Sequence, residues 1–169
     1  MTIKINQTVI GNTHPPYIIA EMSGNHNGDI DNALNIIEEA KRCGADAIKL
    51  QTYTPDTITI KSNKPDFIIK KGLWKNRTLY DLYEEAHTPW DWHEILFNKA
   101  KEVGIDIFSS PFDPSAVDFL EELDVSAFKI ASPEVIDIPL IRKAAQTKKP
   151  LIISTGSATL KQIQEVLDC

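Results

Sequence analysis

Polar side chains stand at the carboxyl ends of five apolar, β-rich segments in this 169-residue sequence. The segments cover residues 17–20, 45–50, 105–109, 126–130 and 151–154. Their polar residues are Glu21; Lys49 and Gln51; Ser109 and Ser110; Lys129, Ser132 and Glu134; and Ser154, Thr155 and Gly156. Burying polar groups costs free energy unless they find partners, so five such strand ends predict a binding site rather than packing alone.

Two lysines indicate the chemistry of that site. Lys49 interrupts Ala-Ile-Lys-Leu and Lys129 interrupts Phe-Lys-Ile, where a solvated charge is not expected. They predict a buried anion. Two cations suit a phosphate and a carboxylate on one small molecule, such as phosphoenolpyruvate. Further donors for this anion are the hydroxyls of Ser110, Ser132 and Ser154 and the backbone of Thr155–Gly156.

A structural interpretation of the same charges is also open. Lys49 and Lys129 could pair with Glu21 and Glu134 in an internal network, because ion-pair networks form without any function. The functional interpretation gives the two glutamates proton transfer or the orientation of a metal-bound water. The residues alone do not separate these two roles.

The apolar segments alternate with segments of helical periodicity, which predicts repeated β-α units and a parallel sheet. This order fits an open doubly wound sheet or the first part of a closed barrel. The predicted helices begin at Asp29, Thr88, Asp113, Asp137 and about Ala158, and the first two end at Gly44 and Gly104.

Two segments lie outside this alternation. Residues 3–10 could form a small β-hairpin, and the polar segment 53–87 is long enough to suggest a functional loop. Asn25–Gly28 predicts a tight turn, and a second interpretation directs His26 at the site. An aromatic cluster, closing a core or covering a sugar, is predicted from Trp74, Trp90, Trp92, Tyr80 and Tyr83.

The bulk properties exclude several classes of protein. A net charge of −6 argues against nucleic-acid binding, and 42% hydrophobic with 25% charged residues is typical of a globular protein. Neither a signal peptide nor a membrane-spanning run is visible, so we expect a cytoplasmic protein that binds no membrane. Cys43 and Cys169 form no C-x-x-C pair, and the four histidines lack metal-ligand spacing, so no metal site is expected within this chain.

Five motifs together resemble the sialic acid synthase family. They are Ala20–Gly28, Ala45–Thr52, Phe108–Phe112, Phe128–Glu134 and Ile153–Gly156, so the resemblance covers nearly the whole chain. The segment Gly72–Trp90 is similar to that of the family branch that makes pseudaminic acid.

The resemblance implies the N-terminal portion of a TIM (β/α)8 barrel, with about five βα units and a small N-terminal hairpin in residues 1–169. It further implies that the remaining strands and a C-terminal antifreeze-like domain lie outside this chain. The implied reaction condenses phosphoenolpyruvate with an N-acetylated amino sugar, 2,4-diacetamido-2,4,6-trideoxy-L-altrose, in a homo-oligomer. A divalent metal, Mn²⁺ or Mg²⁺, would polarise the aldehyde and would be held by two histidines outside this chain.

Residue roles follow from the matching positions. Phosphoenolpyruvate would be held by Lys49, Ser110, Lys129, Ser132 and Ser154. Gln51 and Glu134 would contact the sugar, and Glu21 would lie by the metal-bound water, which makes Glu21 and Glu134 the candidate catalytic residues. Ser110 stands where related synthases commonly have threonine, and it keeps the hydroxyl.

Three alternatives stay open. The substrate could be that of an N-acetylneuraminate or other nonulosonate synthase. A Schiff-base aldolase or lyase would also place a lysine within a barrel strand, as a nucleophile. The chain could finally be a non-catalytic fragment that binds an anion.

Overall fold

The computed structural model describes residues 2–169 and contains two sheets. Five parallel strands in sequence order form the main sheet: β3 (Ile19–Glu21), β4 (Ala47–Thr52), β5 (Asp106–Pro111), β6 (Phe128–Ile130) and β7 (Leu151–Ile153). An antiparallel hairpin consists of β1 (Thr2–Ile5) and β2 (Thr8–Gly11). The strands therefore follow the predicted segments, with shifts of one or two residues.

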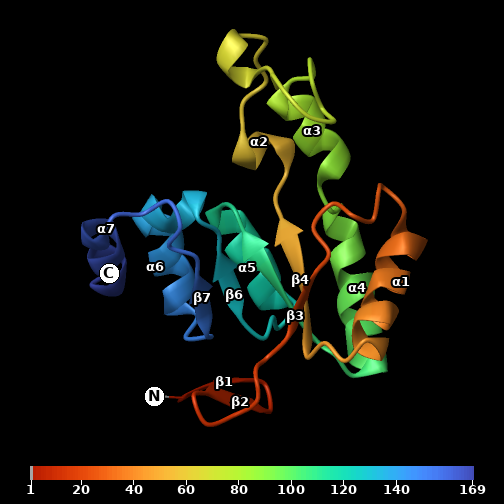
Figure 1. The fold of residues 1–169 in the computed structure, drawn as a ribbon, viewed down its shortest axis with the longest axis vertical. Coiled ribbons are helices and arrows are strands. Elements are labelled where there is room, and N and C mark those ends of the chain that lie inside the picture. The colour runs from red at the N-terminus through yellow and green to blue at the C-terminus, as the bar shows by residue number, and fades with distance from the viewer. Residues whose placement is uncertain (1) are drawn as a thin grey trace.

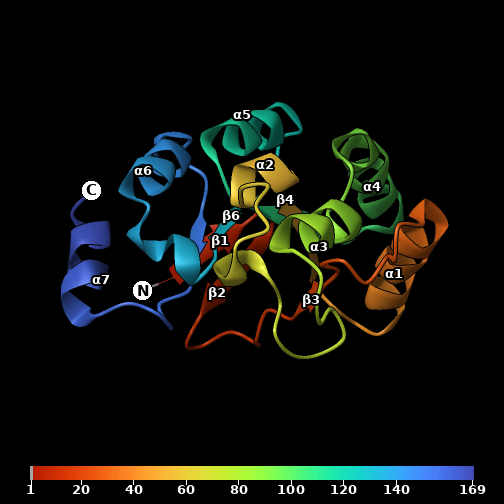
Figure 2. The ribbon, with the colours of Figure 1, turned by 90° about the horizontal axis from the view of Figure 1, so that it is seen from above.

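Helices cover one side of the main sheet in an arc, and the sheet curls with them into half a barrel (Figures 1 and 2). These helices are α1 (Ile30–Arg42), α4 (Trp90–Val103), α5 (Pro114–Glu122), α6 (Ile138–Gln146) and α7 (Leu160–Leu167), with a 3-10 turn, η2 (Pro133–Ile136), before α6. None of the helices in residues 2–169 is long and apolar enough to cross a membrane. The predicted β/α barrel portion is confirmed.

The hairpin closes the lower end of the half-barrel, where the strands begin (Figure 1). Ile5 is fully buried in the same apolar cluster as Ala47 and Phe108. Asp106, at the start of β5, accepts hydrogen bonds from Asn6 Nδ2 at 2.7 Å and from the Tyr17 hydroxyl at 2.6 Å. Burial, followed by this carboxylate, raises the pKa of Tyr17. The opposite, carboxyl end of the sheet is the one that carries the predicted site.

Most helix boundaries confirm the sequence prediction, with one exception. Asp29, Asp113 and Asp137 each accept hydrogen bonds from backbone amides of the first helical turn. The predicted cap at Thr88 is wrong, because α4 begins after Pro89 and no side chain caps it. The Thr88 hydroxyl instead lies 3.3 Å from His26 Nε2. The Thr88 hydroxyl therefore contacts a buried histidine and not the first turn of α4.

The long segment 53–87 contains helices that the sequence prediction left out. It forms α2 (Pro55–Ile58), the 3-10 turn η1 (Pro65–Phe67) and α3 (Leu79–Ala86). These elements make an arm that stands over the carboxyl ends of the strands (Figures 1 and 2). The missed signal is the capping box of α3, in which Thr78 and Asp81 satisfy each other's backbone amides.

The predicted aromatic cluster does not form. Trp90 stacks on Phe119 at 4.7 Å, and Trp92 lies edge-on to His26 at 5.4 Å. Trp74 lies under the Arg77 guanidinium, and Tyr83 meets Tyr53 instead. Helix α4 turns Trp90 and Trp92 toward different neighbours, so proximity in the sequence did not produce contact.

Candidate functional site

Strand alternation places the predicted site residues on the concave face of the sheet. Glu21 pairs with Lys49 across β3 and β4, and Gln51 pairs with Ser110 across β4 and β5. Paired residues of parallel strands point to the same side, and every second residue does so along one strand. By this rule the concave face carries Glu21, Lys49, Gln51, Ser110, Lys129 and Ser154, the last two through their register with the neighbouring strands.

The two lysines differ in their partners. Lys49 forms an ion pair with Glu21, so the predicted internal pairing is realised for this lysine. Within the described residues, Lys129 forms no ion pair. Burial and then repulsion from Lys49 lower the pKa of Lys129, whereas Glu21 and Glu134 raise it. The two lysines and two glutamates therefore interact electrostatically, but only Lys49 forms an ion pair with a carboxylate.

Three buried oxygens at the carboxyl ends of β5 and β6 have no hydrogen-bond partner among residues 2–169. They are Ser110 Oγ, Asp113 Oδ1 and Glu134 Oε2. Unsatisfied buried oxygens are rare in folded proteins and call for an explanation. A ligand at the strand ends would supply it. Asp113 was expected only as a helix cap, a role filled by its other oxygen.

Glu134 lies in the turn after β6 and is half-buried. Its pKa is raised, chiefly because burial penalises the charged form, although Lys129 acts in the opposite direction. A carboxyl group in this environment keeps its proton to a higher pH than usual, which suits proton donation.

The ends of β6 and β7 also converge. The Ser154 amide donates a hydrogen bond to the Ile130 carbonyl at 3.0 Å, which continues the pairing one residue past the end of β7. A Cβ atom at Gly156 would lie 3.3 Å from Ser132 Oγ. Thr155 and Gly156 are exposed, and helix α7 begins only at Leu160, so their backbone groups do not cap a helix.

Ser109 does not share the site with Ser110. Both serines are buried, but alternation directs Ser109 toward the helices, where its hydroxyl lies 2.7 Å from Thr52 Oγ1. Of two adjacent hydroxyls, therefore, one is satisfied within the fold and the other has no hydrogen-bond partner among the described residues.

Aromatic residues that sequence reasoning missed lie at the base of the arm. Tyr53, directly after β4, contacts Tyr83, His87 and Phe112. Burial, followed by Tyr83, raises the pKa of Tyr53 to about 12, so its hydroxyl stays protonated. Tyr53 and Phe112 each follow a site strand, and this position is the signal that could have identified them.

The predicted turn at Asn25–Gly28 is confirmed, with positive φ angles of 52° at Asn27 and 71° at Gly28. His26 is fully buried within it. Its Nδ1 accepts a hydrogen bond from the Gly28 amide at 3.1 Å, and its Nε2 lies 3.3 Å from the Thr88 hydroxyl, so its hydrogen-bond partners are the turn and Thr88. Burial, and then His87, lower its pKa. His26 thus supports the loop.

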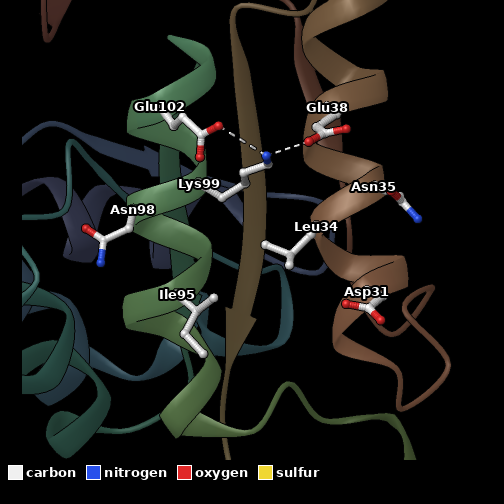
Figure 3. Close-up of a pocket in the computed structure, with 8 residues that line it drawn as sticks. All are labelled: Asp31, Leu34, Asn35, Glu38, Ile95, Asn98, Lys99 and Glu102. Carbon is white, nitrogen blue, oxygen red and sulfur yellow. Dashed lines mark hydrogen bonds and ion pairs between the residues drawn. The ribbon is translucent and has the colours of Figure 1, made fainter.

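Surface hollows lie elsewhere on the molecule. One of about 690 Å³ lies between α1 and α4, on the outer surface of the half-barrel. There Lys99 points between Glu38 and Glu102, with its Nζ 2.5 Å from Glu38 Oε1 (Figure 3). Because the lysine is already paired with carboxylates, this hollow does not resemble an anion site.

The described residues do not supply a metal-ligand set. In residues 2–169, His, Cys, Asp and Glu side chains do not gather in groups of three or more that could hold a metal ion. Glu21, the acid expected beside a metal-bound water, is engaged by Lys49.

A parallel sheet bent into half a barrel, with helices on its outer side, defines the class of (β/α)-barrel proteins, and its charged groups lie at the carboxyl ends of the strands, where such barrels bind their ligands. The NeuB family model matches residues 36–169, and the chain belongs to this family.

Two relatives of known name are similar to this chain in sequence. The chain is 51% identical over 152 residues to a pseudaminic acid synthase of Campylobacter jejuni, covering 90% of this chain and 44% of the relative. It is 35% identical over 158 residues to an N,N'-diacetyllegionaminic acid synthase of Legionella pneumophila, covering 94% and 44%. The chain therefore spans less than half the length of these relatives.

A solved structure agrees with the fold. The N-acetylneuraminic acid synthetase of Leptospira borgpetersenii, in complex with citrate, matches with a TM-score of 0.85 and 28% identity. The match covers 99% of this chain and 54% of that one.

Buried His93 generates a prediction about acid stability. Burial lowers its pKa to about 4, below the ordinary value of 6.5, so folding favours the neutral ring. The associated stability is present above pH 6.5 and is lost as the pH falls toward 4. Between pH 7 and pH 4.5, the free energy of unfolding, measured with urea, should fall by roughly 2 kcal/mol more in the native protein than in His93→Gln. The carboxylates common to both proteins cancel in this comparison, and equal losses would contradict the prediction.

Proposed function

We propose that this chain forms the phosphoenolpyruvate-binding part of a pseudaminic acid synthase. The enzyme would condense phosphoenolpyruvate with 2,4-diacetamido-2,4,6-trideoxy-L-altrose to give pseudaminic acid and phosphate. The observation that carries the proposal is the placement of Lys49 and Lys129 on one concave face. The choice of sugar is supported by the higher identity to a pseudaminic acid synthase, 51% against 35% for the legionaminic acid enzyme.

The anion site follows from the charges. Glu21 already pairs with Lys49, whereas Lys129 lacks an ion-pair partner in the described part of the chain. A phosphate or carboxylate beside Lys129 would offset both its desolvation and the repulsion from Lys49. We assign Ser110, Ser132 and Ser154 to the same ligand, Ser110 because its buried Oγ is otherwise unsatisfied.

In the proposed reaction, C3 of phosphoenolpyruvate forms a bond with the aldehyde carbon of the open-chain sugar, and the aldehyde oxygen takes up a proton. We assign this donation to Glu134, because its raised pKa favours the protonated form. Water then adds at C2 and loses a proton, for which Glu21 is the proposed acceptor. The bond from C2 to the phosphate oxygen then breaks as the C2 hydroxyl becomes the carbonyl of the product. The hydroxyl proton leaves with the phosphate, and Lys129 stabilises this departing anion.

The remaining parts of the proposal concern the sugar, the metal and the assembly of the protein. Gln51 would hydrogen-bond the sugar from its position beside Ser110. A divalent metal, Mn²⁺ or Mg²⁺, would be held by residues outside this chain. The complete protein would act in the cytoplasm as a homo-oligomer.

The rival Schiff-base activity has one observation in its favour. A lysine nucleophile needs a lowered ammonium pKa, and the pKa of Lys129 is lowered by burial and by Lys49. The synthase reaction needs no covalent bond to the enzyme, so the two activities are chemically distinguishable.

Lys129→Ala should weaken phosphoenolpyruvate binding by at least roughly tenfold, because the unpaired cation of the anion site is lost. Isothermal titration with the 169-residue chain measures the change. Lys143→Ala is the matched control, since Lys143 pairs with Asp118 on the outer helices. Unchanged binding by Lys129→Ala would favour a structural role for this lysine.

A chimera tests the sugar. If residues 1–169 replace the matching part of the Campylobacter jejuni relative, the relative supplies the groups outside this chain. We expect phosphate release with phosphoenolpyruvate and the altrose-derived sugar to exceed that with N-acetylmannosamine by roughly tenfold or more. A folded chimera that prefers N-acetylmannosamine would overturn the substrate assignment, and Lys129→Ala within the chimera provides the inactive control.

Borohydride trapping separates the synthase from the aldolase. After incubation with pyruvate and reduction, intact-mass spectrometry should detect no adduct on the native chain. An adduct that Lys129→Ala or Lys49→Ala abolishes would establish the Schiff-base chemistry instead.

A further inference from the structure

A buried polar network lies behind the proposed site, on the helix-facing side of the sheet. Thr52 Oγ1 is 2.9 Å from His93 Nε2 and 2.7 Å from Ser109 Oγ. His93 Nδ1 is 3.1 Å from the Pro89 carbonyl. Thr52, His93 and Ser109 are all fully buried, beside the apolar layer that includes Leu50 and Leu96.

The chemistry of the acceptors sets the direction of every hydrogen bond in this network. The Pro89 carbonyl can only accept, so His93 Nδ1 carries the proton and the neutral ring accepts at Nε2. Thr52 must then donate to His93, and Ser109 must donate to Thr52. The lowered pKa of His93 agrees with a neutral ring. Each of the three side chains is thus satisfied in one arrangement only.

The network is adjacent in sequence to two proposed ligand-binding residues. Thr52 follows Gln51, and Ser109 precedes Ser110, while Gln51 and Ser110 pair with each other across β4 and β5. Since neighbours along a strand point to opposite faces, a bond that orients Thr52 or Ser109 also orients the side chain behind it.

An apolar trio could fill the same space at no cost in stability, because buried polar groups seldom stabilise more than well-packed apolar ones. Apolar contacts, however, are not directional and would tolerate small rotations of the strand ends. Directional hydrogen bonds from two strands to the start of α4 restrict those rotations. The network therefore restricts the rotation of the ends of β4 and β5 more than an apolar cluster would.

We infer that Thr52, Ser109 and His93 form a positioning network that tethers the ends of β4 and β5 to α4 and thereby aims Gln51 and Ser110 into the site. The ligand that these two residues meet rests on the proposed function. The positioning role itself concerns the backbone at residues 51 and 110 and can be tested without a ligand.

Hydrogen–deuterium exchange tests the role directly. Thr52→Val keeps the shape but removes the hydroxyl, and it should accelerate backbone exchange in residues 50–53 and 109–112 by roughly tenfold relative to α1. Thr52→Ser keeps the hydroxyl and should change the exchange less than twofold. Leu140→Ala, a buried substitution on α6, controls for general destabilisation. Unchanged exchange in Thr52→Val, or equal acceleration in Thr52→Ser or Leu140→Ala, would overturn the inference.

A binding cycle measures the consequence at the site. In the native protein, Thr52→Val should weaken phosphoenolpyruvate binding by roughly tenfold. In a protein that already carries Ser110→Ala, adding Thr52→Val should cause no further weakening, because Thr52 acts through Ser110. Full additivity of the two substitutions would contradict this coupling. If the unsubstituted chain binds no phosphoenolpyruvate, the proposed function fails for this chain, and the exchange measurement still decides the positioning role.

Discussion

The parallel pairing of β4 with β5 is the constraint on which the site depends. This register puts Gln51 beside Ser110 and Lys49 beside Phe108, and alternation then assigns every residue of both strands to one of two faces. One face holds the charges and the unsatisfied hydroxyl, whereas the other packs against α1 and α4. A slip of one residue would exchange the two faces, so the site and the helix packing require the same register.

The charges on the concave face are only partly balanced. Lys49 has a carboxylate partner, but Lys129 is half-buried near another cation and has no ion pair among residues 2–169. Burying a charge in this way costs stability unless a counter-charge arrives. The unsatisfied oxygens of Ser110 and Glu134 lie at the same end of the sheet. Together these features describe a site whose free energy falls when an anionic ligand binds.

Local patterns in the sequence predicted the fold well. The alternation of the five parallel strands with the helices that cover them, the hairpin and most helix caps were confirmed, because each depends on residues close together in the chain. The helices of segment 53–87 were missed. Predictions that required distant contacts were less successful. Thr88 was expected to cap α4 but contacts His26. The five aromatic residues near the arm were expected in one cluster, but their rings lie against five different residues.

The sequence by itself determined which residues end the strands and hence which side chains could bind an anion, because strand ends follow from local hydrophobic periodicity. The tertiary structure alone decided which of these side chains remain free. Ser109 and Ser110 stand next to each other at the end of one strand, yet Ser109 contacts Thr52 and Ser110 Oγ has no hydrogen-bond partner in the described chain. Similarly, Lys49 forms an ion pair with Glu21, whereas Lys129 forms none with a carboxylate among residues 2–169. Partnering depends on the register and packing of segments far apart in the chain, which no local pattern encodes.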